Sequence, residues 1–249
     1  MLPGSKDLSG ANMFIHHNEP FDHWIMDEFQ DEDLAKKLSN DFIEFDHKDW
    51  YDYNNPLEVK KTLNNWWNFP PTTYRFIEYL NSAEFIEKLE GVTGIKGLHP
   101  DPGLHGAGWH IHGQGGKLNV HLDYSIHPKL MLERKLNLIY YLSEDWESQW
   151  GGNLEFWKGT SRKAKSKVKT VECKFNRAVL FDTTQNSWHG FPDRLTCPEN
   201  QYRKSIAMYY LVAPQYTVDV ERKRALYVPS KEQENDPEIL ELIESRVRI

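Results

Sequence analysis

The stretch Leu118-Asn-Val-His-Leu-Asp123 decides how this chain is read. Apolar residues alternate with polar ones along it, which is the pattern of a β-strand with one buried face. Residues two apart on a strand point to the same face. We therefore expect His121 and Asp123 to lie side by side, where an imidazole and a carboxylate can bind one metal ion together.

A third ligand, His189, lies far downstream in the sequence. Two imidazoles and one carboxylate on one side of an ion leave adjacent coordination positions open, which is typical of non-haem Fe(II) oxygenases. Arg203 follows after a segment long enough for a loop and a return strand. Its planar guanidinium matches a carboxylate, so we expect it to bind the 5-carboxylate of 2-oxoglutarate.

Further cosubstrate contacts are expected next to Arg203 and on a second strand. Ser205 is two residues beyond Arg203 and shares its face, so its hydroxyl can reach the same carboxylate. Residues 134–142 alternate and predict a strand. One face carries Leu136, Leu138, Tyr140 and Leu142, and the other carries Asn137, Ile139 and Tyr141. On that second face we expect Tyr141 to hydrogen-bond the cosubstrate, with Ile139 as an apolar wall and Asn137 beside them.

The composition excludes several classes of protein. The 249 residues carry a net charge of −7, and the missing basic excess argues against nonspecific binding of nucleic acid. Nine Trp, twelve Tyr and twelve Phe suit a β-rich core. Cys173 and Cys197 are read as two thiols, because so few cysteines do not resemble a disulfide scaffold. No apolar run predicts a membrane span, and residues 1–12 lack a signal-peptide core, so we expect a cytoplasmic protein.

The sequence pattern changes near residue 91, from segments with helical spacing to strand candidates separated by turn signals. We expect one oxygenase domain over 1–249, with a helical N-terminal support over 13–90, a β core over 91–213 and a C-terminal extension with a helix over 214–249. In the support, the spacing predicts helices that start near Asp31, over 71–80 and over 83–90, the last ended by Gly91. The β core contains strand candidates separated by turn signals, which predicts a sandwich or jelly roll. They are 134–142, 152–157, 168–174, 178–182 and 203–212.

Several motifs in the core together resemble a known superfamily. They are His121-Leu-Asp-Tyr, Arg134-Lys-Leu-Asn-Leu-Ile-Tyr-Tyr-Leu, Trp150-Gly-Gly-Asn-Leu-Glu-Phe-Trp157, Asn176-Arg-Ala-Val-Leu-Phe-Asp182, Ser187-Trp-His-Gly and Arg203-Lys-Ser-Ile-Ala. Over about residues 100–213 the chain resembles the 2-oxoglutarate/Fe(II)-dependent oxygenase superfamily, and within it a microbial and phage subgroup of the prolyl 4-hydroxylase-like branch. The resemblance implies a mainly β (α+β) fold with a double-stranded β-helix (jelly-roll) core and supporting N-terminal helices.

The resemblance also implies roles and cofactors. His121, Asp123 and His189 match the iron triad, Arg203 the 5-carboxylate anchor and Tyr141 the cosubstrate tyrosine. Fe(II), 2-oxoglutarate and O2 are the implied cofactors, with ascorbate as a candidate reductant. The stretch His110-Ile-His-Gly-Gln-Gly-Gly116 departs from the tyrosine-containing loop of the animal prolyl hydroxylases, which puts a prolyl substrate in question.

Candidate substrate residues come from two stretches. His110 and His112 share a strand face and are either substrate contacts, rival metal ligands or a structural pair. The aromatic stretch 50–55, with Tyr53 and Asn55, is either a substrate lid or packing of the helical support onto the β core. The neighbouring Lys60 and Lys61 are read as a solvated face.

The expected activity is hydroxylation of an unactivated C–H bond by a 2-oxoglutarate-dependent dioxygenase, with succinate and CO2 as coproducts. The substrate is a peptide or a small molecule, with a prolyl residue in a peptide or protein as one candidate. The alternative within enzymes is a hydroxylase of a free amino acid, a sugar or another small metabolite. From a different class, a noncatalytic jelly-roll binding module stays open. No nucleic-acid or membrane partner is expected, and the sequence does not fix the oligomeric state.

Overall fold

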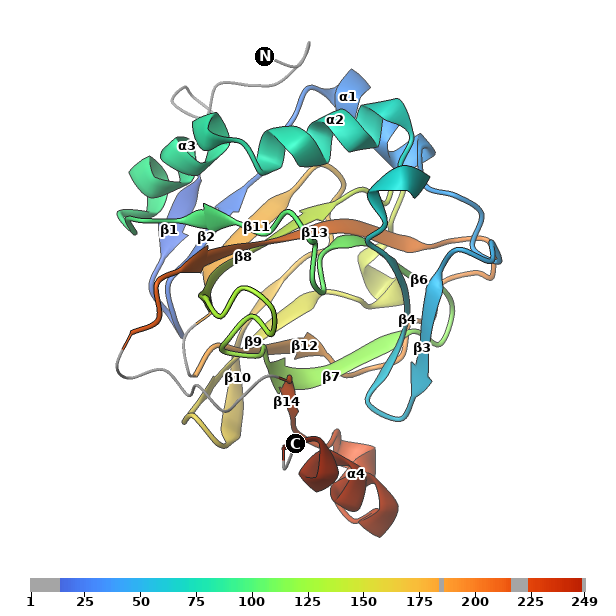
Figure 1. The fold of residues 1–249 in the computed structure, drawn as a ribbon. Helices are drawn as coiled ribbons and strands as arrows, with labels where there is room; N and C mark the ends of the chain where they lie inside the picture. Colours follow the sequence, from blue (N-terminus) through green and yellow to red (C-terminus); the bar gives the residue numbers. More distant parts are fainter. Residues whose placement is uncertain (1–13, 184–185, 216–223, 248–249) are drawn as a thin grey trace.

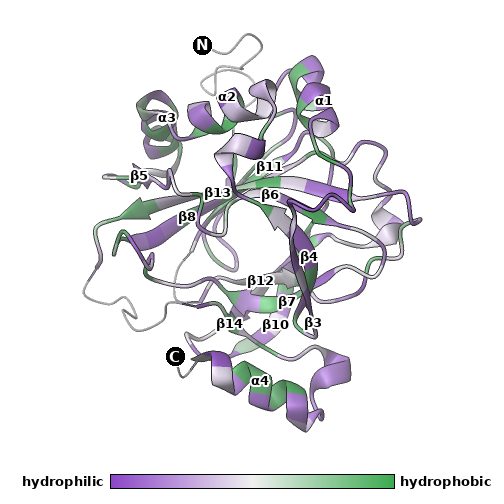
Figure 2. Ribbon diagram, turned by 45° about the vertical axis from the view of Figure 1, so that its right-hand side comes forward, coloured by the Kyte–Doolittle hydropathy of each residue, from purple (hydrophilic) through white to green (hydrophobic). Residues whose placement is uncertain are grey.

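The computed structural model describes residues 14–183, 186–215 and 224–247, so the polar stretch 1–12 lies outside the described residues. Its strands join into one antiparallel sheet that curls into two layers facing each other (Figure 1). This is the jelly-roll architecture that the sequence predicts. Three helices cover the upper layer, and the C-terminal helix lies at the opposite end of the molecule (Figures 1 and 2).

The upper layer has the strand order β1-β2-β11-β8-β13-β6, with β5 paired to β13. The strands are β1 (Ile15–His17), β2 (His23–Met26), β5 (His99–Pro100), β6 (Gly108–His112), β8 (Glu133–Tyr141), β11 (Ala178–Asp182) and β13 (Arg203–Val212). The two faces of β8 separate as predicted. Leu136, Leu138 and Tyr140 belong to the core under the helices, whereas Tyr141 and Ile139 belong to a second apolar cluster inside the curled sheet.

The lower layer has the order β7-β12-β9-β10, with β14 paired to β7. These strands are β7 (Lys117–Leu122), β9 (Leu154–Gly159), β10 (Ala164–Val171), β12 (Trp188–Phe191) and β14 (Leu226–Tyr227). The strand β4 (Glu58–Leu63) forms a hairpin with β3 (Tyr51–Asn55) and pairs with both β6 and β7. It therefore links the two layers along one side of the curled sheet.

The helices over the upper layer are α1 (Glu32–Asn40), α2 (Pro71–Leu80) and α3 (Ala83–Thr93). Proline opens α2, where its missing N–H costs nothing. The Ser82 hydroxyl accepts from the backbone N–H of Phe85 and caps the start of α3. Figure 2 shows hydrophobic and hydrophilic residues side by side on these helices. Their apolar side packs on β8 and β13 and forms the largest core cluster.

The structure corrects parts of the predicted organisation. Residues 13–90 were expected to be helical, but they also contribute β1–β4, whose pairing with β11, β6 and β7 makes them part of the sheet. The aromatic stretch 50–55 contains β3 and so belongs to the β3–β4 hairpin. The helix expected to end at Gly91 continues to a left-handed Gly94.

The other short elements are 3-10 helices and the C-terminal helix. They are η1 (Trp66–Asn68), η2 (Ser148–Trp150), η3 (Lys231–Gln233) and α4 (Pro237–Val247). The helical part of the C-terminal extension therefore consists of η3 and α4. Within the described residues, no helix combines the length and the apolar character needed to cross a membrane.

Candidate active site

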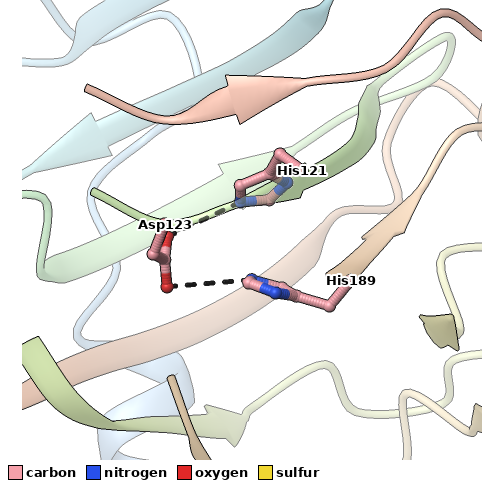
Figure 3. A group of neighbouring side chains, drawn as sticks. All are labelled: His121, Asp123 and His189. Atoms are coloured by element: carbon pink, nitrogen blue, oxygen red, sulfur yellow. Dashed lines mark ion pairs between the residues drawn. The ribbon is translucent and has the colours of Figure 1, made fainter. Parts of the chain in front are cut away.

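Three potential metal ligands meet between β7 and β12. His121 lies on β7, His189 lies opposite it on β12, and Asp123 directly follows β7. One ligand atom from each lies within 4.8 Å of the others, and Figure 3 shows the three side chains converging on one point. All three are buried or nearly so. The predicted juxtaposition of His121, Asp123 and His189 is therefore what the fold produces.

The two imidazoles are held in the tautomer that a metal needs. Nδ1 of His121 lies 2.9 Å from the carbonyl oxygen of Asn119, and Nδ1 of His189 lies 2.8 Å from that of Ser187. A carbonyl only accepts, so each Nδ1 carries the proton and each Nε2 keeps its lone pair. These Nε2 atoms lie 3.6 and 3.9 Å from the Asp123 carboxylate oxygens. Two neutral nitrogens and one charged oxygen facing a common point fit Fe(II).

Electrostatics favours the protonation states that a metal requires. Burial, followed by the nearby His121, lowers the pKa of His189 to about 4, so its imidazole is neutral near pH 7. Burial alone would raise the pKa of Asp123, but the Arg134 guanidinium beside it holds that pKa well below its usual range. The carboxylate is therefore ionised.

Arg134 is a site residue that the sequence reading did not find. Its Nη1 lies 3.1 Å from Oδ1 of Asp123, and its guanidinium lies between the rings of Tyr124 and Tyr209, at 3.5 and 3.4 Å. Asn137 donates to the other carboxylate oxygen at 3.2 Å. Simple alternation places Arg134 on the face of Leu136, away from Asn137. A register irregularity opposite this point, between Tyr210 and Leu211, shifts the pairing of β8 by one residue.

A second polar centre lies around Arg203 on β13. Its side chain is buried, and its Nε donates to the carbonyl oxygen of Gly152 at 2.7 Å and its Nη2 to the Tyr141 hydroxyl at 3.3 Å. Phe191 lies against the guanidinium at 4.5 Å. Within the part of the chain that the structure describes, no carboxylate pairs with it. A buried cation without an acidic partner is costly, which is expected where a ligand carboxylate completes the site.

One cavity of about 680 Å³ connects the two centres. Its lining includes the predicted residues His121, Asp123, Asn137, Ile139, His189, Arg203 and Ser205. Tyr141, which was expected to hydrogen-bond the cosubstrate, does not line the cavity, and its hydroxyl instead accepts a hydrogen bond from Nη2 of Arg203. Ser205 pairs across the ladder with both His110 and Tyr141, so its place beside Arg203 follows from the register of β13.

The predicted substrate residues divide into those in the cavity and one outside it. His110, His112 and Tyr53 line the cavity. Asn55 does not: its side-chain oxygen accepts from the backbone N–H groups of Leu57 and Glu58, and thereby caps the β3–β4 turn. Asn55 is therefore a turn residue outside the lining of the cavity, whereas a substrate contact was expected.

The comparisons with known proteins agree with this geometry. Residues 107–211, which carry the triad and Arg203, match the family model of the 2OG-Fe(II) oxygenase superfamily. These residues therefore form a 2OG-Fe(II) oxygenase domain. The chain is a 2-oxoglutarate-dependent dioxygenase, with Fe(II) as its metal and 2-oxoglutarate and dioxygen as cosubstrates. A search of curated proteins found no match.

Solved structures share the oxygenase fold. A prolyl 4-hydroxylase of Pseudomonas putida superposes with a TM-score of 0.54 at 13% identity, over 76% of this chain and 92% of that chain. A Trichoplax adhaerens prolyl hydroxylase, in complex with a hypoxia inducible factor peptide fragment, gives 0.51 at 18% identity, over 76% and 83%. HygX of Streptomyces hygroscopicus, with nickel, 2-oxoglutarate and hygromycin B bound, gives 0.50 at 12% identity, over 76% and 82%. The oxygenase has the prolyl 4-hydroxylase-like form of the fold.

Proposed function

We propose that this oxygenase binds Fe(II) through His121, Asp123 and His189 and hydroxylates an unactivated C–H bond of a peptide or small-molecule substrate, releasing succinate and CO2. The observation that carries the proposal is the shared cavity. Three ligand atoms within 4.8 Å of one another line the same space as a buried arginine that has no acidic partner among the described residues.

The side chains divide the work between holding the metal and holding the cosubstrate. Bound iron and 2-oxoglutarate supply the oxidising chemistry, in which dioxygen is consumed and 2-oxoglutarate loses CO2. Arg203 pairs with the 5-carboxylate, assisted by the Ser205 hydroxyl and by Tyr141, which fixes the guanidinium. Ile139 and Phe191 supply apolar walls that exclude water from this end of the cavity.

His112 is proposed to contact the bound 2-oxoglutarate, at the end of the cavity near Arg203, rather than the substrate. It is the cross-strand partner of Arg203, it is buried, and neither of its ring nitrogens has a hydrogen-bond partner. A buried polar group left unpaired in the free protein costs free energy that a ligand can recover. We therefore place the His112 ring beside the bound 2-oxoglutarate, and we expect His112→Leu to raise the 2-oxoglutarate requirement.

An anaerobic titration tests the proposal. The full chain is titrated with Fe(II) and then with 2-oxoglutarate, and the visible charge-transfer band of the chelate is recorded. We expect the band in the wild type and its loss in His189→Ala. Iron binding without a band would overturn the cosubstrate assignment, and a band of full intensity in His189→Ala would overturn the metal ligands.

The proposal leaves two candidate classes of substrate, a peptide and a small metabolite. The fold neighbours act in different settings, since one is a prolyl hydroxylase with a peptide and another holds hygromycin B. A prolyl residue in a peptide is the candidate that the resemblance favours, and a free amino acid, a sugar or another small metabolite is the second. Succinate formation with proline-containing peptides, compared with the same assay on free metabolites, distinguishes the two.

A further inference from the structure

The mouth of the cavity is built by two segments far apart in sequence. The β3–β4 hairpin contributes Tyr53, Glu58 and Lys60, and the C-terminal segment contributes Tyr227 from β14 and Arg246 from α4. Figure 1 shows α4 next to β14 at the lower layer, and β14 pairs with β7, which carries His121. The C-terminal segment therefore completes one wall of the site.

Glu58 is the centre of a charged group in this wall. Its carboxylate is buried, and its Oε2 lies 3.2 Å from Nζ of Lys60 while its Oε1 lies 3.3 Å from Nη1 of Arg246. The Tyr227 side chain also interacts with this carboxylate. One carboxylate thus faces two cations, so the group keeps a net positive charge in a confined space where water screens it weakly.

The side chains of the two cations, Lys60 and Arg246, are largely buried, and each packs against an aromatic ring. The Lys60 side chain is only 13% exposed and that of Arg246 26%. The ammonium of Lys60 lies over the Tyr53 ring at 5.0 Å, and the guanidinium of Arg246 over the Tyr227 ring at 5.4 Å. Lys60 was expected to belong to a solvated face, but only its neighbour Lys61 points away, donating to the Phe45 carbonyl oxygen.

The charge of the cavity is opposite to that of the protein. The whole chain has a net charge of −7, yet the cavity is lined by five basic and two acidic side chains. Arg134 pairs with Asp123, and Arg203 is assigned to 2-oxoglutarate. Of the remaining basic residues, Lys60 and Arg246 share the single carboxylate of Glu58, and Arg224 is exposed. This surplus lies at the substrate end and attracts an anion into the cavity.

Tyr227 lies between the charged group around Glu58 and the metal ligand His121. Tyr227 pairs with His121 across the β7–β14 ladder, and its ring stacks on that imidazole at 5.2 Å and 28°. The same Tyr227 contacts Glu58 and Arg246. An anion held by Lys60 and Arg246 would therefore lie one aromatic ring away from the ligands of the iron.

We propose that the substrate of this oxygenase carries an anionic group, a carboxylate or a phosphate, that is bound by Lys60 and Arg246 while the carbon to be hydroxylated lies at the metal ligands. The inference rests on the proposed function, because it takes the cavity between these cations and the triad as the substrate site. Arginine matches the planar or tetrahedral oxygens of either anion, and lysine adds a point charge. Glu58 and Tyr53 position the two cations.

The test uses anions themselves as probes. The full chain is loaded with Mn(II) and saturating 2-oxoglutarate, and the nuclear relaxation of inorganic phosphate is measured with ³¹P and that of acetate with ¹³C. We expect metal-dependent relaxation of at least one ion in the wild type. Lys60→Met and Arg246→Met should each weaken its affinity about tenfold or more, as expected for the loss of a charge-assisted contact. The ion that binds more tightly identifies the anionic group.

The control is Lys61→Met, which removes a cation from the same strand on its other side and should leave the affinity unchanged. Because Lys60→Met leaves a buried carboxylate with one partner fewer, the double variant Glu58→Gln with Lys60→Met serves if the single variant does not fold. Unchanged relaxation in both cation variants, or none in the wild type, overturns the proposal. The proposed function fails separately, by the absence of the Fe(II)–2-oxoglutarate band.

Discussion

Arg134 and Asp123 form a buried ion pair, with Nη1 of the arginine 3.1 Å from Oδ1 of the carboxylate. The two tyrosine rings on either side of the guanidinium leave it little freedom to rotate. Asn137 restrains the second oxygen. The carboxylate is therefore oriented before any metal arrives, which reduces the entropy that metal binding has to overcome.

Replacing Arg134 by Met should weaken Fe(II) binding about 10- to 100-fold, the usual effect of removing a partner of a metal ligand. The measurement is a metal titration of the free protein, so the result does not depend on turnover. Lys135→Met is the matched control, because Lys135 pairs with Asp182 at 2.7 Å instead of with the triad. Equal metal affinity in wild type and Arg134→Met would mean that Asp123 needs no such support.

Asp123→Ala removes the only charged donor of the triad and should abolish both tight Fe(II) binding and succinate formation. Undiminished succinate formation in this variant would contradict the assignment of the metal ligands. His112→Ala is the comparison for Fe(II) binding alone, because it also truncates a buried residue of the cavity but leaves the three ligand atoms intact.

The sequence predicted what depends on local pattern and missed what depends on tertiary pairing. Alternation alone assigned the two faces of β8 and placed His121 beside Asp123. Arg134 was missed because a register irregularity in the β8–β13 pairing changes which face it occupies. The turn contacts of Asn55 were not predicted, because its side chain caps a turn that no strand pattern specifies. Glu58 and Arg246 meet only when α4 returns to the hairpin, 188 residues along the chain.

Arg203→Met should raise the 2-oxoglutarate concentration needed for half-maximal turnover about 10- to 100-fold, because a charge-assisted contact contributes about 1.5–3 kcal/mol. Binding of Fe(II) should not change, since Arg203 does not contact the triad. Apparent 2-oxoglutarate affinity in a succinate assay, measured together with a metal titration, checks both parts. An unchanged cosubstrate requirement would show that another residue anchors the 5-carboxylate.

Gly152→Ala should produce the same defect while Arg203 itself is not replaced. Gly152 has a φ of +77°, and an added Cβ would lie 2.8 Å from Cδ of Arg203 and 2.9 Å from Cδ2 of Leu195. The arginine would have to move away from the carbonyl oxygen that orients it. Gly151→Ala is the control: its φ of +81° imposes a similar backbone strain, but the added Cβ approaches only Leu195, at 3.8 Å. A raised 2-oxoglutarate requirement is expected for Gly152→Ala alone.

His23 makes the stability of the metal-free protein depend on pH in a defined direction. Its ring is fully buried between Phe21 and Phe156, and Nδ1 donates to the Phe21 carbonyl oxygen. Burial, aided by the positive charge of Lys169, lowers the pKa of His23 from 6.5 to about 4. The unfolded chain therefore binds a proton at a higher pH than the folded chain does. The contribution of the neutral His23 to the free energy of unfolding is fully present above pH 6.5 and is lost as the pH falls toward 4.

The wild type should lose about 3 kcal/mol of unfolding free energy through His23 over this window, since each pKa unit corresponds to about 1.4 kcal/mol. His23→Phe keeps the aromatic packing but cannot take up the proton, so its stability should fall less steeply with decreasing pH. Denaturant unfolding of both proteins without metal, at several values between pH 7 and 4, measures the difference between the two slopes. Other buried groups are common to both proteins and cancel in that difference. Parallel curves would place the acid sensitivity of the fold elsewhere than at His23.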